Sequence, residues 1–288
     1  MENTVKITAA EVNKLRQTTG AGMMDCKKAL TEANGDFEKA IEILRKKGAS
    51  VAAKRAEKTA NEGMVKTKIS DDKNTGIIVE VNCETDFVAN SDDFVNFANE
   101  VLQTVDSKRP ANINELLNDE SLKNKMTDLL GKVGEKIEIS RFTIEKAEDG
   151  IVVDYVHLGS KLGVLVRFDN AGKAGDDLQE IGKDIAMQVA AMSPICVKRE
   201  EVPQDVINKE IEIYKEISRK EGKPENILDK IAQGKLNKYY QENCLIEQAF
   251  IKDNSKSVGD LLKEFNSKHG TNASIKLFHR FHLGDEKK

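Results

Sequence analysis

The sequence contains no tryptophan, and aromatic residues make up only 5% of its 288 residues. No apolar run is long enough to cross a bilayer, and the first residues lack the charged-then-apolar order of a secretory signal. The net charge is only −4, which predicts no general affinity for nucleic acid. We therefore expect a cytoplasmic protein that binds neither membranes nor nucleic acid directly. The high share of charged residues, 33%, favours helices with small packed faces and broad solvated ones.

Cysteine is also scarce. Cys26, Cys83, Cys196 and Cys244 are widely separated, and no two form a Cys-x-x-Cys pair. This scatter predicts reduced, mostly buried thiols in a cytosolic protein. The pair Cys83 and His157 could be imagined as a nucleophile and its base. No orienting acid or oxyanion donor accompanies them, which favours a structural thiol.

Other motifs for chemistry are missing. The pattern Gly-x-x-x-x-Gly-Lys-Ser/Thr does not occur, so the chain is not expected to hold a nucleotide through a P-loop. His279 and His282 lie three residues apart on a predicted strand, where they point to opposite faces and predict no metal pair. We expect no catalytic residue, no metal and no cofactor.

Residues 1–54 predict a small unit of three helices. Thr8 and Glu11 form a capping-box pattern at the start of the first helix. Gly20-Ala21-Gly22 then interrupts the chain, and Met23 and Met24 follow this break. The two methionines are either core filler or an adaptable contact surface. Three helices of this size resemble a ubiquitin-associated domain, a fold commonly used for docking.

The second and third helices have their own predicted signals. Asp25 and Asp36 are expected to cap them, Asn34-Gly35 to end the second, and Gly48 to end the third. Residues 49–61 are rich in alanine and lysine and are interpreted as a helical connector. Within it, Lys54 and Arg55 form an exposed basic spot.

Two α/β units are predicted next, followed by a closing segment. In the first, residues 64–69 and 77–81 predict an antiparallel hairpin, and helices are expected from Ser91 and over 113–130. In the second, residues 151–156 and 163–168 predict another hairpin before a helix. Aligning Gly76-Ile77-Ile78-Val79 with Gly163-Val164-Leu165-Val166 places each following helix at a similar offset, which indicates a duplication.

An insertion at about 203–240 carries two apolar stripes around Gly222-Lys223-Pro224 and predicts a protruding antiparallel helical hairpin. A closing helix over 257–265 and a strand over 273–283 follow. The predicted class is α+β: a three-helix domain, then a duplicated α/β core with antiparallel sheets and the helical insertion. The predicted domains span residues 1–54, 55–140 and 141–288.

One stretch, Gly76 to Asn90, contains a strand, a polar corner and then Phe87-Val88. An aromatic residue on such a corner either plugs the chain's own core or enters a partner. From the residues alone, the core plug is the favoured interpretation. The second unit has Asp169-Asn170-Ala171-Gly172 at the corresponding place.

Two motifs carry a family resemblance. ETDFVAN, residues 84–90, follows a strand ending in EVNC and resembles the signature of bacterial elongation factor Ts. Residues 15–30, LRQTTGAGMMDCKKAL, resemble the N-terminal signature of the same family. The resemblance covers nearly the whole chain and implies a guanine nucleotide exchange factor for elongation factor Tu, without covalent chemistry.

The resemblance also implies roles for residues. Phe87 would be a wedge beside the magnesium site of elongation factor Tu, with Asp86 helping to rearrange that site. Thr85 and Val88 complete the segment that is linked to magnesium displacement.

Weaker implied contacts are Arg16, Met23, Met24 and His157, and the exposed basic spot of Lys54 and Arg55 is a further weak candidate for binding the partner. The helical hairpin would reach the GTPase or a second copy, giving a dimer or a 2:2 complex. A ubiquitin-like adaptor or chaperone-type binding protein is the alternative, and an enzyme with an unrecognised site is a third.

Overall fold

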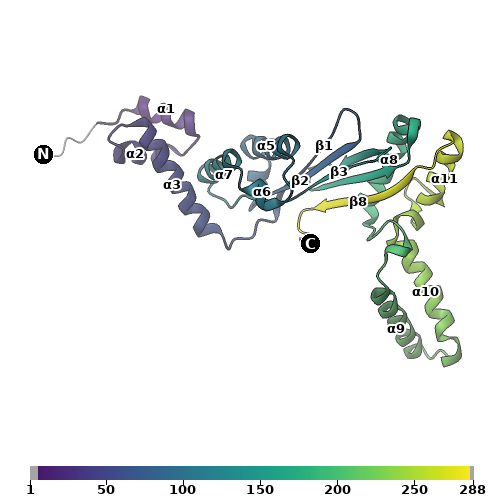
Figure 1. Ribbon diagram of the computed structural model, residues 1–288. Coiled ribbons are helices and arrows are strands. Elements are labelled where there is room, and N and C mark those ends of the chain that lie inside the picture. The colour runs from purple at the N-terminus through teal and green to yellow at the C-terminus, as the bar shows by residue number, and fades with distance from the viewer. Residues whose placement is uncertain (1–5, 286–288) are drawn as a thin grey trace.

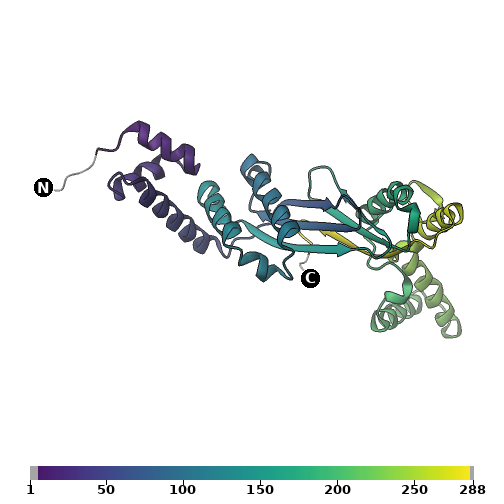
Figure 2. The ribbon, with the colours of Figure 1, turned by 45° about the horizontal axis from the view of Figure 1, so that its top comes forward.

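The computed structural model describes residues 6–285, without the side chains of residues 49, 51, 52 and 173. Residues 1–5 of the first predicted domain and 286–288 of the last lie outside the described part. Figures 1 and 2 show an extended molecule, with the N-terminal helices at one end and a helical arm near the other. None of the helices in the described residues is long and apolar enough to cross a membrane.

The N-terminal unit consists of α1 (Ala9–Thr19), α2 (Met23–Glu32) and α3 (Phe37–Arg55). The capping box of Thr8 and Glu11 is confirmed, and Asp36 caps α3 by accepting a hydrogen bond from the backbone N–H of Lys39. The predicted cap at Asp25 is wrong. Gly22 is the N-cap of α2, and Asp25 lies in the first turn, where it pairs with Lys47.

The predicted end of the third helix at Gly48 is also wrong, because α3 continues to Arg55. Gly48 faces α7 (Glu120–Val133) at a close helix crossing. A Cβ atom added to Gly48 would lie 2.8 Å from the backbone oxygen of Thr127 and 3.5 Å from the Cα of Gly131. The glycine therefore serves the contact between the two helices, and most of the predicted connector is the last part of α3.

The first sheet contains β1 (Glu62–Ile69), β2 (Thr75–Cys83) and β3 (Glu138–Lys146), all antiparallel, in the order β1-β2-β3. The predicted hairpin is confirmed. We did not predict β3, and the predicted boundary at residue 140 falls inside this strand.

The helices of the first unit follow β2. They are α4 (Asp86–Ala89), α5 (Asp92–Lys108), α6 (Ile113–Leu117) and α7. The single helix predicted over 113–130 is wrong. Asn112 caps α6 and Asp119 caps α7, so the chain restarts its helix there.

The second sheet has β4 (Ile151–Val156), β5 (Leu162–Asp169) and β8 (Ser274–His282) in the order β4-β5-β8. Helices α8 (Gly175–Met192) and α11 (Val258–His269) belong to this unit, and the short strands β6 (Ala249–Phe250) and β7 (Asp253–Ser257) were not predicted. Ser257 caps α11 with Asp260 in a capping box.

The two sheets pack against each other through glycines at matching positions. A Cβ on Gly76 of β2 would lie 2.5 Å from Cγ1 of Val152 on β4. A Cβ on Gly163 of β5 would likewise lie 2.5 Å from Cγ1 of Val65 on β1. The register shifts also match, between Glu80 and Val81 in one sheet and between Arg167 and Phe168 in the other. These correspondences support the predicted duplication.

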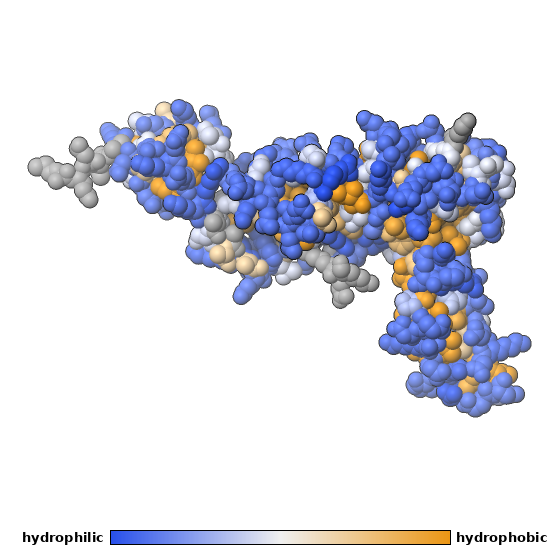
Figure 3. Space-filling model, in the orientation of Figure 1, coloured by the Kyte–Doolittle hydropathy of each residue, from blue (hydrophilic) through white to orange (hydrophobic). Residues whose placement is uncertain are grey.

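The inserted arm is an antiparallel pair of helices, α9 (Gln204–Lys220) and α10 (Leu228–Asn243), and it projects from the second unit (Figure 1). Its buried cluster lies at the base, around Val202, Tyr240 and Cys244. Farther out, Ile213 and Ile217 are exposed, so the outer part of the apolar stripe on α9 faces solvent. Figure 3 shows the resulting apolar stripe along the arm.

Candidate functional site

The corner after β2, residues 84–90, is built on a short helix. Thr85 is the N-cap of α4, with extended backbone and a side-chain oxygen that accepts from the backbone N–H of Val88. Ser91 then caps α5, and its hydroxyl donates to the backbone oxygen of Val88 at 2.7 Å. Two successive helix caps thus shape residues 84–91 into a compact corner between β2 and α5.

One aromatic side chain on this corner points into solvent. Ala89 is buried and Val88 is half-buried against the core of the first unit, whereas Asp86 and Phe87 are exposed. The Phe87 side chain is 84% exposed. The core-plug interpretation is therefore wrong. A large apolar ring held in solvent on an ordered corner is typical of a surface that contacts a partner.

Four hydrogen bonds anchor the corner to neighbouring elements. Glu135, just after α7, accepts from the backbone N–H of Thr85 at 3.0 Å and from its hydroxyl at 2.7 Å. Glu84 accepts from the backbone N–H of Lys136 at 2.7 Å and from a guanidinium nitrogen of Arg55 at 2.6 Å. Arg55 is therefore half-buried and paired within the chain, in contrast to the exposed basic spot predicted for it.

Cys83 lies beneath the corner as a structural group. Burial raises the pKa of its thiol to about 12, and the Glu135 carboxylate adds to the shift. The neutral thiol donates a hydrogen bond to the backbone oxygen of Thr85 at 3.2 Å. This environment opposes a thiolate nucleophile, as the sequence predicted.

The turn between β4 and β5 belongs to the same region. Lys161 in this turn forms an ion pair with Glu62 of β1 at 2.6 Å. Glu62 lies opposite Cys83 in the register of β1 and β2. The hydrogen bond to Glu62 raises the pKa of Lys161, and Asp86 contributes in the same direction. The ion pair with Glu62 thus places this turn beside the end of β2 that leads into the corner.

His157 and Leu158 occupy that turn. His157 is exposed, and its Nδ1 shares a 2.8 Å hydrogen bond with the hydroxyl of Tyr155. The Leu158 side chain is 94% exposed, and we did not single it out from the sequence. The sequence feature that could have identified Leu158 is its position, an apolar residue directly before Gly159 at the tip of a predicted hairpin. Gly159 and Ser160 adopt positive φ values of 85° and 56°, which set the tight turn.

The remaining predicted residues lie apart from this region. Arg16 is exposed on α1, and Lys54 is exposed near the end of α3. Met23 and Met24, at the start of α2, are 51% and 62% exposed, so they form surface and not core filler. The N-terminal unit consequently carries a separate exposed apolar surface at the start of α2.

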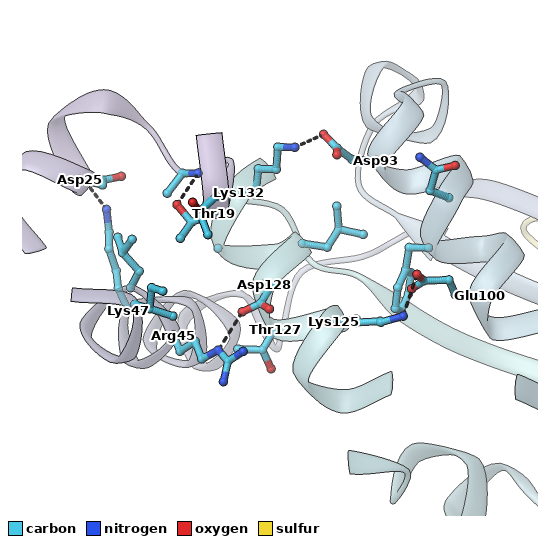
Figure 4. A pocket seen from close by; sticks show the side chains of 18 residues that line it. Thr19, Asp25, Arg45, Lys47, Asp93, Glu100, Lys125, Thr127, Asp128 and Lys132 are labelled. Carbon is cyan, nitrogen blue, oxygen red and sulfur yellow. Dashed lines mark hydrogen bonds and ion pairs between the residues drawn. The ribbon is translucent and has the colours of Figure 1, made fainter. Parts of the chain in front are cut away.

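A cavity of about 410 Å³ lies between the N-terminal unit and helices α5 and α7, beside the close contact of α3 with α7 (Figure 4). Its basic side chains are already paired with acids: Lys47 with Asp25, Arg45 with Asp128, Lys125 with Glu100, and Lys132 with Asp93. The cavity therefore has no unpaired cluster of positive charge for an anion, and its lining combines these ion pairs with apolar side chains such as Ile41, Leu44 and Phe97.

The two histidines of the final strand, His279 and His282, have separate acidic partners. His279 bonds to Glu145 at 2.8 Å, and His282 approaches Asp285 at 3.5 Å. Within residues 6–285, no group of three or more His, Cys, Asp or Glu is placed to hold a metal ion. The corner and its neighbouring turn are the features that best fit a contact function.

Comparison with known proteins finds relatives over nearly the full chain. The family model described as Elongation factor TS matches residues 84–285. An elongation factor Ts from Chlorobium phaeobacteroides (strain BS1) is 47% identical over 287 residues, which cover 97% of this chain and 99% of the relative. One from Christiangramia forsetii is 50% identical over 265 residues, covering 90% and 93%. One from Clostridium perfringens is 45% identical over 285 residues, covering 97% and 93%.

Proposed function

The chain belongs to the elongation factor Ts family, whose members act in translation elongation, and from this membership we propose that it binds elongation factor Tu and promotes the exchange of GDP for GTP. The observation that carries the proposal is Phe87, an exposed ring on an anchored corner. Exchange requires no covalent chemistry from this chain. It requires tighter binding to the nucleotide-free GTPase than to the loaded one.

Phe87 supplies that differential binding by entering between helices of elongation factor Tu beside its magnesium site. Asp86 helps to rearrange the same region, while Thr85 and Val88 hold the short helix that presents both side chains. Once Mg²⁺ leaves, the charge on the nucleotide phosphates is less neutralised, and GDP dissociates sooner. Each tenfold acceleration needs about 1.4 kcal/mol of differential binding, so several contacts must act together.

The other contacts follow from exposure. Leu158 and His157 extend the apolar and polar surface next to the corner. Met23 and Met24, with Arg16, give the N-terminal unit an adaptable surface for the nucleotide-binding domain. Lys54 remains a weaker contact, and Arg55 acts inside the chain through Glu84.

The arm gives a further contact. Its exposed Ile213 and Ile217 lie on α9, and Ile227 precedes α10. We propose that this stripe reaches the GTPase or the arm of a second copy, which would give a dimer or a 2:2 complex.

The test is the release of fluorescent GDP from elongation factor Tu, with this protein at catalytic concentration. Phe87→Ala should lower the accelerated rate at least tenfold, because a buried aromatic contact at an interface is commonly worth about 2 kcal/mol or more. Its thermal midpoint should stay unchanged, since the ring makes little contact within the chain. Ile251→Ala, which shortens another exposed apolar side chain in the second unit, is the matched control.

Full acceleration by a folded Phe87→Ala variant would contradict the role of the wedge. No acceleration by the unaltered protein would contradict the exchange function and favour an adaptor that binds without exchange.

A further inference from the structure

Two carboxylates link the corner to the segment that follows α7, each accepting a hydrogen bond from the other segment. Glu84, on the corner, accepts the backbone N–H of Lys136, and Glu135, on the other segment, accepts the backbone N–H of Thr85. The two short segments therefore hold each other reciprocally. Glu135 adds a second bond, because the Thr85 hydroxyl donates to its other oxygen at 2.7 Å.

The corner depends on these bonds more than an ordinary helix start would. Helix α4 has only four residues, and so short a helix is not stable by itself. Its cap bond from Val88 to the Thr85 hydroxyl is long, at 3.4 Å. Phe87 adds little packing, because its ring lies in solvent. The packing of Val88 and Ala89 on the core holds one end of this short helix, and the direction in which Phe87 points depends at the other end on what holds Thr85.

We propose that Glu135 is a positioning residue for the exchange contact: it fixes Thr85, and through Thr85 it holds the Phe87 ring in one orientation before the partner arrives. This inference rests on the proposed function for its consequence, but the fixed orientation is a property of the free chain. A ring that is already oriented loses less conformational freedom on binding than a mobile one.

Glu84 completes the arrangement. Its second oxygen accepts from Arg55, in the last turn of α3, so the corner is also tied to the N-terminal unit. Glu135 is nevertheless the residue to change, because both of its oxygens bond to Thr85, whereas Glu84 divides its bonds between two elements.

The first experiment needs no partner. The chain has no tryptophan, so Phe87→Trp introduces a single indole at the site in question, which can be excited selectively over the tyrosines. In this background, Glu135→Ala should lower the steady-state fluorescence anisotropy of the indole, because both bonds to Thr85 are lost. Glu135→Gln should lower it less, since the amide oxygen can still accept the Thr85 N–H. Glu180→Ala, at an exposed position on α8, should leave it unchanged. Equal anisotropy in all four proteins would overturn the proposal.

The second experiment measures GDP release from elongation factor Tu. Glu135→Ala should lower the accelerated rate about tenfold, with Glu135→Gln in between, while circular dichroism shows that both variants are folded. In the Phe87→Ala background, Glu135→Ala should cause no further loss, because the group that it orients is gone. A merely structural role would give the same loss in both backgrounds, and that result would contradict the proposal.

The two experiments separate the two proposals. If Glu135→Ala mobilises the indole but neither Glu135→Ala nor Phe87→Ala changes GDP release, the positioning is real and the wedge function is wrong. If Phe87→Ala abolishes acceleration while Glu135→Ala changes neither anisotropy nor rate, the wedge stands and the positioning role is wrong.

Discussion

In both α/β units the central strand leads into a helix, but the first unit uses eight residues, 84–91, for this connection and the second uses five, 170–174. The strands themselves correspond closely, since each sheet has its register shift at the matching place. The first connection forms a four-residue α-helical turn, α4, and the second forms a three-residue 3₁₀ turn, Gly172–Ala174.

Both connections bury alanines in their own unit, but they differ in the large side chain that the first one exposes. In the first, α4 exposes Phe87 while two carboxylates hold its base. In the second, Ala171 and Ala174 are buried in the core of their own unit. The framework of paired sheets is thus the common part, and the proposed contact lies in the longer of the two connections.

The largest expected effect comes from removing this difference. Replacing residues 84–91 with the five-residue sequence Asn-Ala-Gly-Lys-Ala of the second unit should reduce GDP release from elongation factor Tu to the unassisted rate. The sheets should persist, because β2 and α5 keep their own pairing and core contacts. Circular dichroism checks the fold and fluorescent GDP checks exchange. Retained acceleration by the shortened, folded chain would show that the corner is not the exchange contact.

The reciprocal change tests the inward connection. Ala171→Phe should destabilise the protein by about 3 kcal/mol or more, because Ala171 is completely buried and the core has no room for a ring. Phe87→Ala, in the other connection, should leave the free energy of unfolding nearly unchanged. Urea denaturation of both variants measures the contrast. If Ala171→Phe were as stable as the unaltered chain, the second connection would be a tolerant surface loop and the comparison would fail.

Local signals in the sequence were enough for much of this framework. The capping box at Thr8, both hairpins and the arm depend on residues close together in the chain, and these predictions are confirmed. The pattern at Thr8 and Glu11, for example, specifies a helix start without reference to the rest of the fold.

Features that depend on distant packing were missed. By propensity, Gly48 is expected to end a helix. It lies inside α3 instead, and a glycine is needed there because α7 approaches too closely for a side chain. Strand β3 pairs with β2 from more than fifty residues away. Composition also could not reveal that Phe87 faces solvent, because the corner that carries it is anchored by Glu135, 50 residues from Thr85 in the sequence. The contact roles given to Thr85–Val88 stay predictions until exchange is measured.

The matching glycines give the next test of the comparison. Gly76→Ala and Gly163→Ala should each destabilise the protein by about 1–3 kcal/mol, since each new Cβ would lie 2.5 Å from a valine methyl group of the opposite sheet. Val152→Ala should rescue the first variant and Val65→Ala the second, and the exchanged combinations should not. Thermal denaturation of the four double variants measures this. Rescue by either valine substitution in either variant would mean general loosening and not paired contacts.

The smallest effect concerns Thr67 and Asp154, which are 87 residues apart and therefore occupy matching positions in the two hairpins. The Thr67 hydroxyl donates to the Asp154 carboxylate at 2.5 Å, so the two copies meet here through equivalent residues. A hydrogen bond to a charged acceptor that is partly shielded from water should give a coupling of about 1 kcal/mol.

A double-mutant cycle with Thr67→Val and Asp154→Ala, followed by urea denaturation, measures that coupling directly. Arg219 and Glu225 on the exposed arm are the control pair, and their cycle should show no measurable coupling because solvent screens them. A bond at the junction of two matching strands stabilises the pairing of the units and not either unit alone. Zero coupling at this junction would therefore leave the packing of the sheets to the apolar contacts around Gly76 and Gly163.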